Sequence, residues 1–425
     1  MRKKVLVRAP VLTRSGYGEH GRFVLRALRE REDLFEIFII PIAWGMTGWL
    51  AEDSEERKWI DSTIAKTAEY GSRGGQWDIS IQVTIPNEWE PIAPINIGVT
   101  AGIETTRVAP VWLEKVNMMD RVITVSEHSK AVFESTVYEG QNKNTGQPMT
   151  LKCETPVDVV HYPVKTYDNV PDLGIDFDYD FNFLAVAQQS PRKNIENTIR
   201  WFVEENIDQK VGLVLKTFIK NGCIPDLFFT EGMLKGILSK YPERKCKIYL
   251  LHGDMTDEEM HALYLHPKIK CLVSTTHGEG FGLPIFEAAY SSLPIIAPGW
   301  SGQCDFLYAP YLGDDKKKKG KNKKRPYFSE VDFDVQPIPP HAVWEGVLME
   351  DSMWCYPAEG SFKMKIRRMR KNYSKSLKRS KELQGWIFEN FKEEDMNKKF
   401  TDLIYTEEAF DVENWLDGLN VEEHA

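Results

Sequence analysis

The sequence is poor in cysteine and contains no long hydrophobic run. Its six cysteines are scattered and form no Cys-x-x-Cys pair, which argues against a zinc ribbon or a disulfide scaffold and favours a reducing compartment. No apolar stretch approaches the roughly 18 residues that a membrane span needs. Arg8 and Pro10 interrupt the first apolar run, which makes it too short for a signal peptide. We therefore expect a cytoplasmic protein, with peripheral membrane contact as the alternative.

An excess of positive charge is also absent. The net charge is −9 and the pI is near 5.6, which disfavours a general nucleic-acid binder. The 425 residues are enough for two domains of ordinary size, each with its own core. The composition, 42% apolar and 28% charged, is typical of soluble globular proteins.

The N-terminus has the pattern of a strand, a glycine-rich loop and a helix. Residues 4–7 are an apolar run, the loop RSGYGEHG follows with three glycines, and apolar residues recur at helical spacing in 22–28. Such a unit opens a doubly wound domain. The glycine spacing is that of a dinucleotide fingerprint, but the next apolar run, 35–42, ends without the acid that binds ribose. An NAD site is therefore not expected.

Strand-like and helix-like segments alternate along the rest of the chain. Ser126 has the position of a helix N-cap, Thr256 and Glu259 have the spacing of a capping box, and Asn194 is a further candidate cap. The alternation predicts an α/β protein with mainly parallel sheets and functional sites at the carboxyl ends of the strands. The further expected strands span 77–84, 94–100, 120–125, 157–164, 183–188, 211–217 and 247–251.

Composition divides the chain into two domains joined by a linker rich in Asp, Gly and Pro. Asp176, Asp178 and Asp180 in this linker imitate a metal-binding Asp-x-Asp motif, but alternating acids before a strand more often form a solvated face. The tail is expected to be helical and to pack back toward the first domain. The expected units are 1–168, the linker 169–181, 182–395 with a basic insertion at 314–326, and the tail 396–425.

Residues 271–307 combine a β-like run, a glycine-rich turn and a helix-like segment that starts at Pro284. Proline suits a helix start, so the amides of 281–283 are expected to point from the helix N-terminus toward an anion. Glu279 and Glu287 flank this predicted phosphate cradle. Their carboxylates can accept hydrogen bonds from sugar or ribose hydroxyls while the amides hold a diphosphate. The stretch predicts a sugar-nucleotide site, although a glycine turn alone would favour a merely structural role.

The segment EGFGLPIFEAAYSSLPIIAP, residues 279–298, resembles the Glu-x7-Glu signature of the retaining glycosyltransferases of family 4. DRVITVSEHSK, residues 120–130, is similar to a second pattern of that family. The resemblance implies the GT-B fold, in which two Rossmann-like doubly wound domains face each other across a cleft. It also implies transfer of a hexose from a UDP-, GDP- or ADP-linked sugar to an acceptor hydroxyl with retention, and no requirement for a metal or other cofactor.

Carried onto this sequence, the resemblance makes 1–168 the acceptor-side domain and 182–395 the donor nucleotide-sugar domain, with donor contacts expected from both. The N-terminal glycine loop is expected to face the diphosphate across the cleft, and the loop after the strand 247–251 is expected beside the nucleotide base. Glu287 is expected to bind the ribose. The expected donor-binding residues are Gly16, Tyr17, Gly18, Lys216, His252, Gly253, Gly280, Phe281, Gly282, Leu283 and Glu287.

The expected catalytic centre contains Glu279, which would hold hydroxyls of the donor sugar. Arg192 and Lys193 would stabilise the charge that grows on the leaving phosphate. Lys193 matches the lysine of the family, whereas Gln188 or Gln189 stands where the family has arginine. Either Arg192 supplies the missing charge or donor binding is weakened.

The acceptor side is less defined by the sequence. Glu104, the fourth expected catalytic residue, is either an acceptor-site or catalytic neighbour or a helix cap. A glycan or lipid-linked glycan is the first expected acceptor. A modified DNA base is the second, because basic runs at 316–325 and 363–381 could contact anionic membrane or nucleic acid, with ordinary solvation as the alternative. Sugar-nucleotide epimerisation and a non-catalytic sugar-nucleotide or nucleic-acid binding module also stay open.

Overall fold

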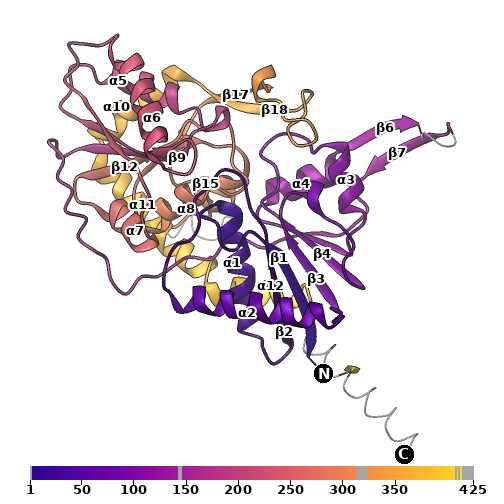
Figure 1. Cartoon of the computed structure of the whole chain (residues 1–425). Helices are drawn as coiled ribbons and strands as arrows, with labels where there is room; N and C mark the ends of the chain where they lie inside the picture. Colours follow the sequence, from indigo (N-terminus) through magenta and orange to yellow (C-terminus); the bar gives the residue numbers. More distant parts are fainter. Residues whose placement is uncertain (1, 142–145, 314–322, 407–408, 410–411, 414–425) are drawn as a thin grey trace, which may run out of the picture.

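The computed structural model describes residues 2–141, 146–313, 323–406, 409 and 412–413. They form two α/β domains, each built on a six-stranded sheet with only parallel strand pairs (Figure 1). The predicted α/β class with parallel sheets is therefore confirmed. Within these described ranges, no helix is long and apolar enough to cross a membrane.

The N-terminal sheet has the strand order β2-β1-β3-β4-β5-β8. Its strands are apolar runs because helices cover both faces: α1 contributes to the core cluster on one face, and α3 and α4 contribute to the cluster on the other. The elements are β1 (Lys3–Ala9), α1 (Gly16–Arg29), β2 (Phe35–Pro41), α2 (Glu55–Ser72), β3 (Ile79–Val83), β4 (Ile95–Thr100), α3 (Pro110–Val116), β5 (Arg121–Thr124), α4 (Glu127–Ser135) and β8 (Val157–Val159). A separate hairpin, β6 (Val137–Gln141) and β7 (Pro148–Lys152), projects from this domain (Figure 1).

The C-terminal sheet has the strand order β11-β10-β9-β12-β13-β16, the order of a dinucleotide-binding Rossmann fold. The cluster on one face includes residues of α7, α8 and α11, and the cluster on the other includes residues of α5, α6 and α10. The strands are β9 (Asn182–Gln188), β10 (Gly212–Phe218), β11 (Lys247–Leu251), β12 (Ile269–Val273), β13 (Ile295–Pro298) and β16 (Ser329–Val331). The helices are α5 (Ile195–Glu205), α6 (Ile224–Leu238), α7 (Asp257–Leu265), α8 (Leu283–Tyr290), α9 (Cys304–Leu307), α10 (Glu359–Lys371) and α11 (Tyr373–Asn390).

Local side-chain chemistry fixes several helix starts as the sequence predicts. The Ser126 side chain accepts a hydrogen bond from the amide of Ser129, and Thr256 with Glu259 forms a complete capping box at α7. The prediction for Asn194 is right in position, since Asn194 is the N-cap residue of α5, but wrong for its side chain. Asn194 precedes α5, but its backbone is left-handed, with φ of 54°, and its side chain donates to the carbonyl of Thr275 instead of capping the helix.

Two further segments join the domains. Residues 160–181, between β8 and β9, contain neither helix nor strand, yet Tyr162 and Phe177 are buried in the C-terminal core. The last helix, α12 (Glu393–Asp402), packs on α1: the rings of Phe400 and Phe23 lie 5.8 Å apart, and Asn397 donates to Glu30 at 2.8 Å. The tail thus adds to the hydrophobic core of the first domain.

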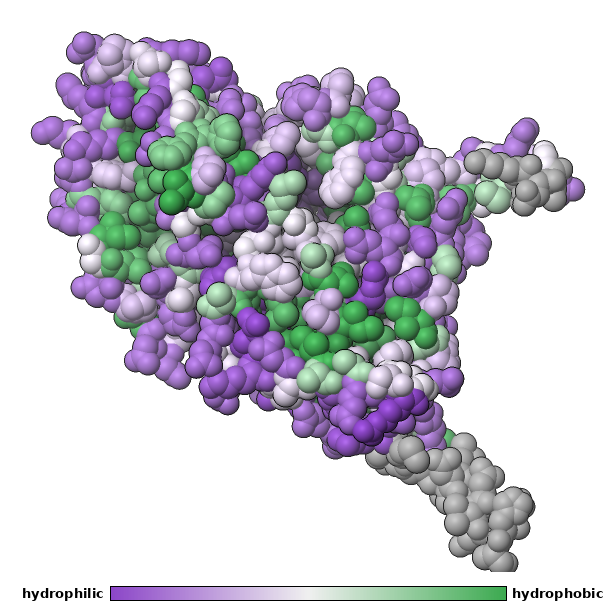
Figure 2. Space-filling model, viewed as in Figure 1, coloured by the Kyte–Doolittle hydropathy of each residue, from purple (hydrophilic) through white to green (hydrophobic). Residues whose placement is uncertain are grey.

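A pair of short strands, β17 (Phe333–Pro337) and β18 (Met353–Pro357), extends from the C-terminal domain toward the N-terminal domain (Figure 1). Another short pair is β14 (Tyr308–Ala309) with β15 (Arg325–Pro326). Most of the visible surface is hydrophilic, but Figure 2 shows a hydrophobic patch over α6. Ile224, Phe228 and Phe229 are the large apolar side chains exposed on this helix, with Phe229 at 72%.

Candidate functional site

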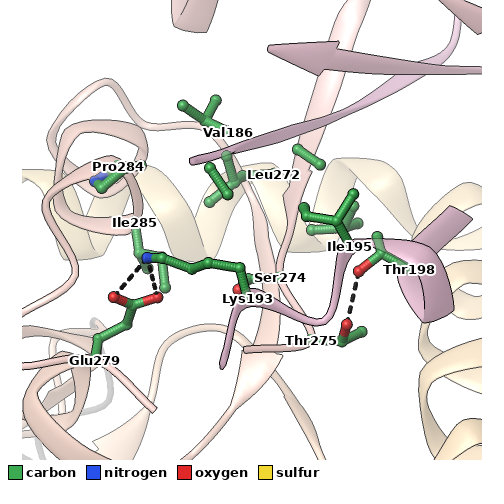
Figure 3. Close-up of a pocket in the computed structure, with 13 residues that line it drawn as sticks. Val186, Lys193, Ile195, Thr198, Leu272, Ser274, Thr275, Glu279, Pro284 and Ile285 are labelled. Atoms are coloured by element: carbon green, nitrogen blue, oxygen red, sulfur yellow. Dashed lines mark hydrogen bonds and ion pairs between the residues drawn. The ribbon is translucent and has the colours of Figure 1, made fainter. Parts of the chain in front are cut away.

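The candidate site lies at the carboxyl ends of β9 and β12, neighbouring strands between which the winding of the C-terminal sheet reverses. Open α/β sheets bind ligands at such a switch point. The chain leaves β9 through a short 3₁₀ turn, Pro191–Lys193, into α5, and leaves β12 through the glycine turn into α8. These connections enclose a small cavity whose lining includes Lys193, Glu279 and Ile285 (Figure 3).

Glu279 is the centre of a buried ion cluster. Its Oε1 and Oε2 accept from Lys193 Nζ at 2.6 and 2.7 Å, as Figure 3 shows, and Oε2 also accepts from Arg192 Nη1 at 2.8 Å. Burial alone raises the pKa of Glu279, but the charges of Lys193 and Arg192 outweigh it and lower the pKa to about 2. Glu279 is therefore ionised at neutral pH, and the structure brings together three residues that the sequence analysis placed in the catalytic centre.

Glu104 joins this cluster from the N-terminal domain. Its Oε1 lies 3.5 Å from Arg192 Nε, and only 8% of the residue is exposed. The interpretation of Glu104 as a helix cap is wrong, because α3 begins only at Pro110 and its N-cap is Ala109, without a capping side chain. The alternative role, as a catalytic or acceptor-site neighbour, stays a prediction. Trp300, which the sequence analysis did not select, donates from Nε1 to the carbonyl of Glu104 at 3.0 Å.

The glycine turn serves a close approach of the two domains. A Cβ on Gly280 would lie 2.3 Å from the carbonyl oxygen of Ala101, and one on Gly278 would lie 2.8 Å from Cβ of Glu104. Gly278 also has a φ of 152°. A side chain at either position would therefore push the N-terminal domain away from the ion cluster.

The start of α8 partly matches the predicted phosphate cradle. Gly282 is the N-cap, with a left-handed φ of 95°, and Leu283 and Pro284 are the first and second helical residues. Among the described residues, none accepts a hydrogen bond from the amides of Phe281, Gly282 or Leu283. Phe281 itself is buried in the core and contacts the Tyr162 ring at 5.2 Å between centroids. The amides at this helix N-terminus are thus free to bind an anion.

The N-terminal glycine loop forms the start of α1. The amide of Gly18 donates to the Ser15 side chain at 2.9 Å, and a Cβ on Gly18 would lie 2.1 Å from the carbonyl oxygen of Thr13, so only glycine fits. Gly16 faces open space. The Tyr17 hydroxyl lies 2.8 Å from Oγ1 of Thr100, at the end of β4 and beside the loop that carries Glu104. The loop therefore lies at the same edge of the sheet as Glu104.

The other predicted donor residues form two separate groups in the C-terminal domain. Lys216 donates to the carbonyl of Gly253, and His252 lies 3.1 Å from the carbonyl of Cys223. Glu287 accepts from the Tyr264 hydroxyl at 2.8 Å, and burial raises the pKa of Glu287 to about 7. No contact within the described part of the chain joins either group to Glu279, so their ligand roles stay predictions.

The two glutamines at the family's arginine position point elsewhere. Gln188 donates to the carbonyl of Ile219 at 3.0 Å, and Gln189 donates to Thr230 at 3.0 Å. Arg192 instead reaches both Glu279 and Glu104. The positive charge beside Lys193 thus comes from Arg192.

The second basic run does not support the membrane or DNA interpretation. Residues 316–322 of the first run lie outside the described residues. In the second run, Lys363 pairs with Glu204 at 2.6 Å and Arg367 with Glu205 at 2.8 Å, so charges of α10 are neutralised by α5. The run is divided at Asn372, between the end of α10 and the start of α11.

The acids of the linker are engaged by lysines. Asp176 lies 2.5 Å from Lys268 and Asp178 lies 2.8 Å from Lys247. In the described part of the chain, no group of three or more His, Cys, Asp or Glu side chains could hold a metal ion. The linker segment that resembles an Asp-x-Asp metal motif is therefore part of an ion-paired surface.

Comparison with known proteins identifies the fold. No family model matches the chain. An alignment of 200 residues, which covers 44% of this chain, is 26% identical to the serotype-specific mannosyltransferase WbdA of Escherichia coli; it spans only 22% of that protein. HepE of Anabaena, solved with UDP and glucose, matches with a TM-score of 0.57 and 12% identity, over 95% of this chain and 99% of that one.

Two further solved structures agree with HepE. Sucrose-phosphate synthase of Thermosynechococcus elongatus matches with a TM-score of 0.59 and 13% identity, over 95% of this chain and 98% of that one. A glycosyltransferase of Rickettsia africae matches with a TM-score of 0.55 and 12% identity, over 95% and 97%. The chain therefore has the GT-B glycosyltransferase fold, as the sequence predicts. Membership of family 4 stays a prediction.

Proposed function

We propose that the chain is a glycosyltransferase that moves a hexose from a nucleoside-diphosphate sugar to an acceptor hydroxyl. The observation that carries the proposal is the ion cluster at the switch point, where Glu279, Arg192 and Lys193 of one domain meet Glu104 of the other. The free amides at the start of α8 add an anion site next to this cluster. The similarity to a mannosyltransferase and the UDP and glucose bound to HepE support a nucleotide-hexose donor.

In this proposal the cations of the cluster bind the donor diphosphate and its carboxylate binds the donor sugar. Arg192 and Lys193, which pair with Glu279, turn to the donor diphosphate and stabilise its growing charge. Glu279 is ionised and so accepts hydrogen bonds from the sugar hydroxyls. The acceptor oxygen bonds to the anomeric carbon on the face from which the diphosphate leaves. The leaving phosphate oxygen takes the acceptor proton, and the configuration at the anomeric carbon is retained.

The test compares Glu279→Ala with Glu204→Ala, a control on α5 of the same domain that removes the pair with Lys363. UDP-, GDP- and ADP-linked hexoses are offered with oligosaccharide acceptors, and the anomeric configuration of the product is read by NMR. We expect the Glu279 variant to lose at least about 100-fold in kcat/KM, equivalent to about 2.7 kcal/mol of transition-state stabilisation, and the control to stay within about twofold.

Three outcomes would contradict parts of the proposal. Unchanged turnover by the Glu279 variant would show that the site assignment is wrong. Donor consumption that does not depend on acceptor would favour epimerisation or hydrolysis. Thermal stabilisation by UDP, GDP or ADP without turnover of any donor would favour the non-catalytic binding module, since a ligand that binds only the folded state stabilises it.

A further inference from the structure

Residues 333–357 leave the C-terminal domain and reach the N-terminal domain; we call them the interdomain strap. β17 and β18 pair antiparallel over their whole length, from Phe333 with Pro357 to Pro337 with Met353. Figure 1 shows this pair above the space between the two domains. The strap is distinct from both sheets, because neither of its strands belongs to the two six-stranded sheets.

The base of the strap, at Cys355 in β18, is hydrogen-bonded to the loop that carries Glu279. The Cys355 amide donates to the carbonyl of His277 at 3.1 Å, and His277 Nδ1 lies 2.6 Å from the carbonyl of Cys355. Since a carbonyl only accepts, Nδ1 carries the proton in this contact. The His277 ring is stacked parallel to Trp354, with 5.4 Å between centroids, and its pKa is lowered by burial. His277 is therefore a neutral, buried link between β18 and the loop.

The backbone of the same histidine also contacts Arg192. The His277 amide donates to the carbonyl of Arg192 at 2.8 Å, and Arg192 Nη1 donates to the carbonyl of Gly278 at 2.7 Å. Glu279 is the next residue. A shift of β18 therefore moves the backbone that sets the positions of Arg192 and Glu279.

The tip of the strap, residues 346–353, contacts the N-terminal domain at a few positions. Asn87 donates to the carbonyl of Gly346 at 2.9 Å, and Arg107 pairs with Asp351. The Met353 amide donates to Thr106 at 3.1 Å, two residues from Glu104. Val347 is buried in the hydrophobic cluster of this domain. Leu348 and Met349 pack against the same cluster, so the tip is held by apolar contacts as well as by the Arg107–Asp351 pair.

We propose that the interdomain strap is a positioning element: docking of its tip on the N-terminal domain holds, through β18 and His277, the arrangement of Arg192 and Glu279 that catalysis needs. The inference rests on the proposed transferase function for its consequence in catalysis. The mechanical coupling can be measured without any activity. The acceptor-side loop, Thr106 and Arg107, is thereby connected to the donor-side loop by a path outside the cleft.

The experiment breaks the tip contact by charge reversal and restores it. Asp351→Arg and Arg107→Asp each place like charges together, and the double variant recreates an opposite pair. In the wild type, both single variants and the double variant, amide hydrogen exchange is followed at His277 and Cys355. We expect exchange at both amides to become about tenfold faster in each single variant and to return within about twofold in the double variant. In transfer assays, kcat is expected to fall about tenfold while the donor KM changes less than about twofold.

Asp61→Arg is the matched control, because Arg57 and Asp61 form a pair of similar exposure within α2: 25% and 51%, against 28% and 52% for Arg107 and Asp351. It is expected to leave both amides and kcat unchanged. The proposal is overturned if Asp351→Arg speeds exchange at Met353 but not at His277, or if the double variant is no better than the single ones. Absence of any transfer by the wild type would instead contradict the proposed function and leave the exchange result standing.

Discussion

At the scale of single residues, the two acids of the predicted signature have opposite electrostatic surroundings. Glu279 lies between two cations, which lower its pKa to about 2 in spite of burial. Glu287 lies on the next helix against the Tyr264 hydroxyl, where burial raises its pKa to about 7. The sequence places them eight positions apart as equivalent acids. The difference in pKa comes from contacts with residues distant in the sequence, so the sequence alone could not predict it.

Glu287→Gln is expected to stabilise the protein at neutral pH. The folded state keeps the Glu287 proton up to about pH 7, whereas the unfolded chain loses it near 4.5. Between these values the folded state binds more protons, so the free energy of unfolding falls as pH rises. Urea unfolding should show the variant more stable by roughly 1–2 kcal/mol at pH 7.5, a value reduced for solvent screening, and equal to wild type near pH 4.

Glu204→Gln provides a control of opposite sign. Burial raises the pKa of Glu204, but hydrogen bonds from Lys363 and Tyr241 outweigh it and lower the pKa. This acid contributes stability above its unfolded pKa, so its removal should lower stability at neutral pH, by less than about 1 kcal/mol for a partly exposed pair. If Glu287→Gln also lowers stability at pH 7.5, the burial argument for Glu287 is wrong.

At the scale of elements, the glycine turn before α8 has two roles that its sequence does not separate. The first is the predicted one, a helix N-terminus with free amides. The second is to leave room for the N-terminal domain, whose loop at Ala101 and Glu104 lies close to Gly280 and Gly278. Neighbouring glycines in a sequence suggest a phosphate-binding loop, whether they bind an anion or allow another domain to approach closely. Only the position of the other domain shows why Gly280 cannot carry a side chain.

Gly280→Ala should therefore act on transfer more than on nucleotide binding. The new Cβ would meet the carbonyl oxygen of Ala101 at 2.3 Å, so the N-terminal domain must shift away from Arg192. A misplacement of about 1 Å costs about 100-fold in rate, and we expect such a fall in kcat. Binding of UDP, measured by calorimetry, should change less than about fivefold, because the start of α8 and Lys193 stay in one domain.

Gly385→Ala in α11 is the control for the substitution itself. Nothing lies within 4 Å of a Cβ at this position, so alanine should stabilise the helix by about 0.5–1 kcal/mol and leave transfer unchanged. Equal rates for Gly280→Ala and wild type would show that the close approach at Ala101 has no part in catalysis.

The sequence predicts elements well where the signal is local and poorly where it is not. The strands are continuous apolar runs, and the capping box at Thr256 is confirmed, because both depend on neighbours in the chain. The failure at Asn194 has a tertiary cause, since its side chain bonds to Thr275 on another strand connection. The interdomain strap was missed because its strands have only five residues each and pair across fifteen others. Trp300 and His277 were missed because their partners, Glu104 and Cys355, are distant in the sequence.

At the scale of the whole molecule, the two domains are connected by more than the segment between β8 and β9. The interdomain strap reaches from the second domain to the first, and α12 returns to α1 after the second domain is complete. Lys165, in the first connection, pairs with Glu19 of α1 at 2.8 Å and with Asp257 of α7 at 2.7 Å. Relative motion of the domains is therefore constrained at three places along the chain.

The contribution of α12 can be tested with Phe400→Ala. Phe400 is fully buried in the core cluster of the N-terminal domain, and its ring contacts Phe23 edge to face. Truncation of a buried phenylalanine costs about 3–5 kcal/mol, because it loses apolar burial and leaves a cavity. Calorimetry should show a lower unfolding temperature for the transition that includes the first domain, although Phe400 follows the second domain in the sequence. Phe229→Ala, at a residue 72% exposed on α6, should shift stability by less than about 0.5 kcal/mol. Similar behaviour of both variants would mean that the C-terminal tail contributes nothing to the stability of the N-terminal core.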